Sequence, residues 1–78
     1  MYRSVNDVAR QVLEIVPEET VLHVQINKFI KNLWNQAPEA LFSSYNWLKF
    51  IDVLNTYGLD DTIDKSVVDK IHDIVRNN

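Results

Sequence analysis

The stretch Leu41-Phe-Ser-Ser-Tyr-Asn-Trp-Leu-Lys-Phe-Ile-Asp-Val-Leu-Asn-Thr-Tyr57 places apolar side chains almost all round a helical wheel. Only Lys49, Asp52 and Thr56 form a consistently polar strip. A membrane span would need about 20 apolar residues in a row, and Lys49 and Asp52 interrupt this run, so it must be covered by protein. We therefore predict that 41–57 is the central and most buried helix of the domain.

The two ends of this stretch carry residues that suit helix termini. Ser43 or Ser44 can cap the start, because a serine hydroxyl can accept a hydrogen bond from a free backbone N–H there. The only glycine of the chain, Gly58, follows the stretch and suits a left-handed residue just past a helix end.

An amphipathic helix is predicted before the first proline, over residues 4–16. Ser4 is a good N-cap and Asp7 completes a pair that resembles a capping box. The apolar residues from Val5 to Val16 fall on one arc of the wheel, and Pro17 ends the pattern.

The segment after Pro17 fits two secondary structures. Residues 20–27 alternate apolar and polar side chains, which is typical of a strand. A longer apolar stripe runs from Leu22 to Trp34 at helical spacing, and its length favours a helix over about 18–36. Val21 and Val24 then point away from the main stripe, toward a neighbouring helix or an interface.

A last helix is predicted over about 61–76, capped by Asp60 or Asp61. Ser66 and Asp69 offer a second capping pair, in which case 60–65 is a loop. Only a few residues separate each predicted helix from the next, and connections of that length make successive helices neighbours. We expect a single all-α domain over 1–78, a compact four-helix fold with helices at about 4–16, 18–36, 41–57 and 61–76 and the third helix central.

Composition narrows the possible functions. The chain has 78 residues, a net charge of −3 and 46% apolar residues. It has no cysteine, and this absence excludes disulfides and thiolate zinc sites. Its eight Lys and Arg residues are spread along the chain, so a dedicated nucleic-acid binder is disfavoured. The N-terminus shows no apolar signal core, and we expect a cytoplasmic protein with no membrane segment.

Three sets of residues carry the chemistry of a catalytic or metal site, and each has a simpler interpretation. The two histidines, His23 and His72, lie in no metal-binding motif and sit at the edges of apolar faces. The carboxylates that begin at Asp60 lack the glycine and glutamate of a calcium loop, and helix capping explains them. Ser43 and Ser44 are explained as helix caps. We therefore expect no catalytic residue, no cofactor and no metal, and not an enzyme.

Two short stretches resemble known families. Ser4-Val-Asn-Asp-Val-Ala-Arg10 resembles the opening of the helix-turn-helix in some bacterial repressors, which implies a DNA-binding regulator. The glycine-bearing turn that should follow is replaced by Val12-Leu-Glu-Ile-Val16. Phe50-Ile-Asp-Val-Leu-Asn-Thr-Tyr-Gly-Leu59 is similar to part of the carrier proteins that bear phosphopantetheine, but the Asp-Ser-Leu motif of that family is absent.

The apolar side chains exceed what a small domain readily buries. The aromatic residues are either all core, or some of them form an exposed patch near the second proline. Trp and Tyr dominate interface hot spots. We therefore expect a small non-enzymatic protein–protein interaction module (a regulator, inhibitor or assembly subunit) that binds a protein partner or its own copy as a homodimer. The predicted interface residues are Val21, Val24, Trp34, Phe42, Tyr45 and Trp47.

Overall fold

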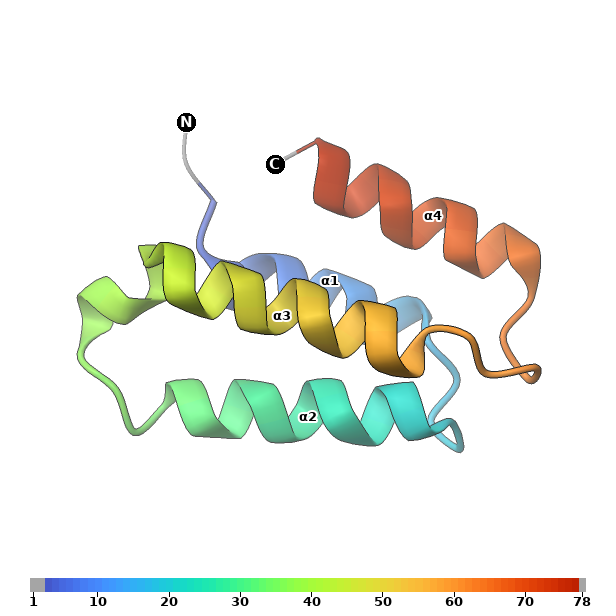
Figure 1. Ribbon diagram of the computed structural model, residues 1–78, viewed down its shortest axis with the longest axis horizontal. Coiled ribbons are helices and arrows are strands. Elements are labelled where there is room, and N and C mark those ends of the chain that lie inside the picture. The colour runs from blue at the N-terminus through green and yellow to red at the C-terminus, as the bar shows by residue number, and fades with distance from the viewer. Residues whose placement is uncertain (1–2, 78) are drawn as a thin grey trace.

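Helices make up most of residues 3–77, the part of the chain that this computed structural model describes (Figure 1). The elements are α1 (Val5–Ile15), α2 (Val21–Leu33), the 3-10 helix η1 (Pro38–Phe42), α3 (Ser44–Tyr57) and α4 (Lys65–Arg76). The described residues contain no strand, so the all-α prediction is confirmed and residues 21–27 belong to a helix. The molecule measures 35 × 24 × 18 Å.

Hydroxyl side chains cap the starts of the first three α-helices. The hydroxyl oxygens of Ser4, Thr20 and Ser43 accept hydrogen bonds from the backbone N–H groups of Asp7, His23 and Asn46, at 3.1, 3.1 and 3.2 Å. Each bond satisfies a donor that the helix itself leaves without a partner. The capping roles predicted for Ser4 and Ser43 are confirmed.

The predicted start of the second helix at residue 18 is wrong. Residues 17–20 form a turn, in which the Thr20 hydroxyl donates to the Pro17 carbonyl at 2.7 Å while its oxygen caps α2. These two hydrogen bonds mean that one side chain both closes the turn and caps the helix. Thr20 is only 2% exposed. The proline therefore opens a turn before the helix, and α2 begins at Val21.

Other helix ends also differ from prediction. The second helix stops at Leu33 rather than 36, because Trp34, Asn35 and Gln36 make the tighter i→i−3 bonds of a terminal turn. Residues 38–42 form η1, so α3 begins only at Ser44. The last helix begins at Lys65, close to the alternative in which 60–65 is a loop.

Gly58 does not adopt the left-handed conformation that its position predicted. Its φ is −78° and its N–H still bonds to the Leu54 carbonyl at 2.8 Å, so the chain leaves α3 in a right-handed turn. A Cβ at this position would collide with the Leu54 carbonyl oxygen. The glycine is needed here for close backbone approach rather than for a positive φ.

The core is centred on α1. Val5, Val8, Ala9 and Val12 are fully buried, and α1 packs against α2, α3, α4 and η1. The rest of the core comes mainly from α2, through Leu22, Ile26, Phe29, Ile30 and Leu33.

Helix α3 packs centrally against α1 and α2, as expected (Figure 1). The expectation that it would be the most buried helix is wrong, because Phe50 and Asn46 are its only buried residues. Phe50 meets Phe29 of α2 with ring centroids 5.5 Å apart. Tyr45 and Leu48 lie on the outer side and are 67% and 69% exposed. No helix covers that side, because α4 packs chiefly against α1.

This uneven burial predicts opposite outcomes for two aromatic truncations on the same helix. Phe50→Ala should lower the free energy of unfolding by about 3–5 kcal/mol, because it removes a fully buried ring and leaves a cavity. Tyr45→Ala should change it by no more than about 0.5 kcal/mol, because the ring lies largely in water. Urea denaturation followed by circular dichroism measures both, and a large loss in Tyr45→Ala would contradict its surface position.

Candidate functional site

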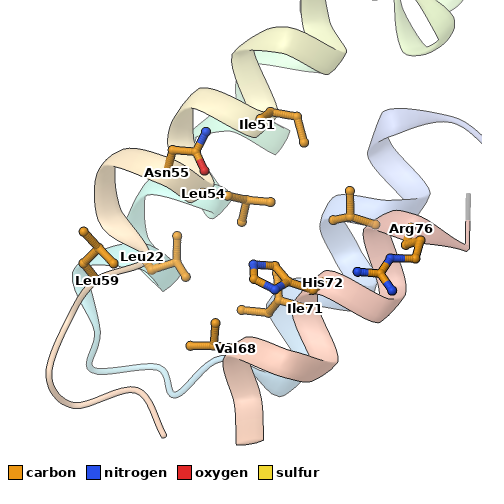
Figure 2. Close-up of a pocket in the computed structure, with 11 residues that line it drawn as sticks. Leu22, Ile51, Leu54, Asn55, Leu59, Val68, Ile71, His72 and Arg76 are labelled. Carbon is orange, nitrogen blue, oxygen red and sulfur yellow. The ribbon is translucent and has the colours of Figure 1, made fainter. Parts of the chain in front are cut away.

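An apolar groove of about 570 Å³ lies between α3 and α4 (Figure 2). Its floor includes Leu22 of α2 and Ile71 of α4, both buried. Half-buried apolar side chains form its walls, and Asn55, His72 and Arg76 bring polar groups to its rim. The complete lining is Leu22, Ile51, Leu54, Asn55, Gly58, Leu59, Val68, Ile71, His72, Val75 and Arg76.

The groove exists because α4 is held away from α3. The apolar stripe of α4 packs chiefly on α1. At its C-terminal end, the Arg3 guanidinium donates hydrogen bonds to the carbonyl oxygens of Ile74 and Asn77, at 3.4 and 3.3 Å. These bonds satisfy carbonyls at the negative end of the helix dipole. The position of α4 is therefore fixed by α1 and Arg3 rather than by α3.

The loop at the other end of α4 is ordered by Asp60. Its carboxylate accepts hydrogen bonds from the Thr62 hydroxyl at 2.7 Å and the Thr62 N–H at 2.8 Å. The bond from the Thr62 side chain, then that from its backbone, lowers the pKa of Asp60, and the backbone of Val21 acts in the same direction. Val21 is the first residue of α2, so the positive end of that helix adds to the effect of Thr62.

Apolar surface continues beyond both ends of the groove. Leu59, at the turn after α3, lines the groove and is 87% exposed. Leu48 lies three and seven residues before Ile51 and Asn55, so the three share one face of α3. In Figure 2, Leu22, Leu54, Ile71 and Val68 converge on the space between the helices, while Leu59 points outward from it. We name this surface, from Leu48 across the groove to Leu59, the α3–α4 face.

The six residues predicted as an interface lie outside the groove lining. Val21 and Val24 are exposed on the outer side of α2. Trp34 is also exposed, and the Arg10 guanidinium lies 5.8 Å from its ring centroid.

Phe42 and Tyr45 are exposed near the start of α3, and the Lys49 ammonium lies 5.4 Å from the Tyr45 ring centroid. Trp47 differs, because it is half-buried and packs against the core. The predicted patch is therefore only partly an exposed surface.

The groove itself was not predicted from the sequence. The sequence feature that could have indicated it is the surplus of apolar residues on the two helices on either side of the α3–α4 loop. Each of these helices carries an apolar stripe wider than one neighbouring helix covers. The residues concerned are Ile51, Leu54 and Leu59 at α3, and Val68 and Val75 on α4. The pattern shows the surplus but not which stripe lacks a neighbour.

A second, smaller cleft of about 200 Å³ lies between α2 and α3 and is lined by polar residues together with Phe29 and Val53. Its base includes Asn46, which is 2% exposed and donates hydrogen bonds from Nδ2 to Gln36 Oε1 and to the Ala40 carbonyl, both at 2.9 Å. These bonds fix the corner between η1 and α3. Lys28 and Lys49 also line the cleft and are exposed to solvent.

The other sequence candidates fall into structural roles. Within residues 3–77, no three His, Cys, Asp or Glu side chains come together in a way that could hold a metal ion. His72 lines the groove, and His23 lies on α2, where its backbone N–H takes part in the Thr20 cap. Ser43 caps α3, and Ser44 is exposed at its first position.

Comparisons with protein-family models, with curated proteins and with solved structures find no match for this chain. Among the described residues, no helix has both the length and the apolar character needed to cross a membrane.

The Asp60 contacts predict a pH-dependent effect on stability. The lowered pKa means that the folded state favours the carboxylate, so this stabilisation is present above the ordinary aspartate pKa and is lost as the pH falls through the lowered one. Asp60→Asn should therefore be less stable than wild type at neutral pH. The difference should shrink as the pH falls below about 4.

Urea titrations from neutral to acidic pH measure this difference. The matched control is Asp61→Asn, which removes an exposed neighbouring carboxylate and the same charge. Equal behaviour of the two variants at every pH would show that the Asp60 hydrogen bonds contribute nothing specific.

Proposed function

We propose that this chain is a non-enzymatic protein–protein interaction module and that the α3–α4 face is its binding surface. The observation that carries the proposal is an apolar groove that continues onto two leucines exposed by 69% and 87%. Contiguous exposed apolar surface on a small protein marks an interaction site. We propose a second copy of the chain as the first partner to test. We also propose a cytosolic location, and the lack of cysteine is compatible with that reducing compartment.

The shape of the surface favours a protein partner over a small molecule. The groove volume is within the range of about 300–1,000 Å³ that small-molecule sites occupy. A small ligand would leave Leu48 and most of Leu59 in water, however, because both extend beyond the groove. A protein surface that covers the whole face would bury these side chains as well.

The chemistry of the lining supports binding rather than catalysis. The polar side chains in the lining are those of Asn55, His72 and Arg76. The lining contains no carboxylate, hydroxyl or thiol that could act as a nucleophile beside His72. His72 and Arg76 are suited to orient an anionic group of the partner at the rim.

Self-association should be measurable by sedimentation velocity over a wide concentration series. We expect a reversible monomer–dimer equilibrium. Leu48→Asp should raise the dimer dissociation constant by about tenfold or more, equivalent to at least about 1.4 kcal/mol, because it places a charge in an apolar interface. Circular dichroism should show an unchanged helix content, since Leu48 is exposed.

Val24→Asp is the matched control, because it makes the same change at an exposed apolar residue of α2. A dimer that is weakened by Val24→Asp and not by Leu48→Asp would move the interface to α2. A wild-type protein that stays monomeric at every concentration would exclude its own copy as the partner.

DNA binding through the first two helices remains the alternative. One observation favours it: α2 contains no acidic residue and exposes Lys28 and Lys31. A complex with duplex DNA that forms at low salt and weakens as salt rises would support this alternative, and no complex at low salt would exclude it.

A further inference from the structure

We propose that the cleft between α2 and α3 binds the phosphate group of a small hydroxylated molecule, a phosphorylated polyol of a few carbons. The cleft has a volume of about 200 Å³, which is the space that about seven water molecules occupy in the liquid. It shares no lining residue with the α3–α4 groove. The inference therefore goes beyond the proposed function and does not depend on it.

Two lysines bring positive charge to this cleft from different helices. Helices α2 and α3 pack side by side (Figure 1), and Lys28 of the first and Lys49 of the second both line the cleft between them. Both side chains are exposed, so each keeps its charge in contact with water. Two ammonium groups at one cleft repel each other, and an anion bound between them replaces this repulsion with two attractions.

No acidic side chain of the described residues takes the place of that anion in the lining. The chain has 11 acidic and 8 basic residues, yet α2 contains none of the acidic ones. Asp52, the only acidic residue of α3, lies about a quarter of a turn away from the side that lines the cleft. The Tyr45 ring, whose centroid lies 5.4 Å from the Lys49 ammonium, is uncharged and leaves the positive charge in place.

Four amide side chains complete the polar part of the lining, those of Gln25, Asn32, Gln36 and Asn46. The Asn46 amide is fixed before any ligand arrives, because its Nδ2 donates to Gln36 Oε1 and to the Ala40 carbonyl, both at 2.9 Å. The first of these bonds uses the oxygen of Gln36, so Nε2 is the part of that amide that can donate to an anion. A polar group that is already ordered costs less to use in binding.

This combination of groups selects the chemistry of the ligand. A phosphate monoester carries a charge of about −1.5 to −2 at neutral pH, which matches two lysines better than a single carboxylate does. Amide groups both donate and accept hydrogen bonds, so they suit hydroxyl groups on the rest of the molecule. An apolar substituent would find little surface, because the apolar lining residues are Val53 and the buried Phe29.

The test is an NMR titration of the isotope-labelled protein at constant ionic strength, with glycerol 3-phosphate, inorganic phosphate and glycerol as probes. Both phosphate compounds should cause saturable shifts in the side-chain amide signals of Gln36 and Asn46. Glycerol 3-phosphate should bind about two- to tenfold more tightly than inorganic phosphate, because its hydroxyls add hydrogen bonds to the amides. Glycerol, which has no charge, should cause no saturable shift.

Three lysine variants show where the anion binds. Lys28→Gln and Lys49→Gln should each raise the dissociation constant of glycerol 3-phosphate by about tenfold, since each removes one charge-assisted contact. Lys31→Gln is the matched control, because Lys31 is an exposed lysine of α2 outside the lining. It should change the dissociation constant by less than about twofold. All three side chains are exposed, so the fold should be unchanged by circular dichroism.

The other outcomes overturn the inference. No saturable shift with either phosphate compound would show that the cleft binds no phosphate group. Equal losses in Lys28→Gln and Lys31→Gln would show that anions respond to the general positive charge of α2 rather than to the cleft.

A parallel titration with duplex DNA separates the two sources of a phosphate group. Binding of DNA that depends on Lys28 and Lys31 but not on Lys49, without binding of glycerol 3-phosphate, would replace the small ligand with the DNA alternative. Equal affinities for inorganic phosphate and glycerol 3-phosphate would overturn the hydroxyl contacts.

Discussion

Burial of the α1 stripe is the constraint on which the rest of the structure depends. Val5, Val8, Ala9 and Val12 are fully buried, and every other helix packs against this one element. A helix that contacts four other elements through one face favours small, branched side chains on that face, because large ones would keep its neighbours apart. The valines of α1 meet that requirement. Most of the bulky buried residues lie on the helices that surround it, while Leu13 and Ile15 of α1 are only partly buried against the core.

The turns and caps are what allow such short connections between these helices. Thr20 closes the turn that Pro17 opens, and at the same time begins α2. At the corner between η1 and α3, the Ser43 hydroxyl caps α3. The buried side-chain amide of Asn46 donates a hydrogen bond to the carbonyl of Ala40 there. In both corners, backbone polar groups that would be costly to bury without partners are satisfied by side chains within a few residues.

The candidate site follows from the way α4 is attached. Because α4 packs chiefly on α1 and its C-terminal end is held by Arg3, the sides of α3 and α4 that face each other are only partly covered. Two helices with wide apolar faces therefore leave a groove between them, with the exposed Leu59 in its lining and the exposed Leu48 beyond it. Apolar area that one copy does not bury remains available to drive association.

The amino-acid sequence alone determined the helical class, the approximate positions of the four helices and the caps at Ser4 and Ser43. These features are local, since they depend on spacing and on side chains within one turn of the residues concerned. Tertiary packing decided which apolar faces are covered. Trp47 and Tyr45 look equivalent in the sequence, yet one packs against the core and the other lies in water. The groove is likewise a tertiary property, because periodicity reveals how wide a stripe is but not which helix lies against it. A stripe becomes core or surface only when the crossing of distant helices is fixed, and here the packing of α4 on α1 fixed it.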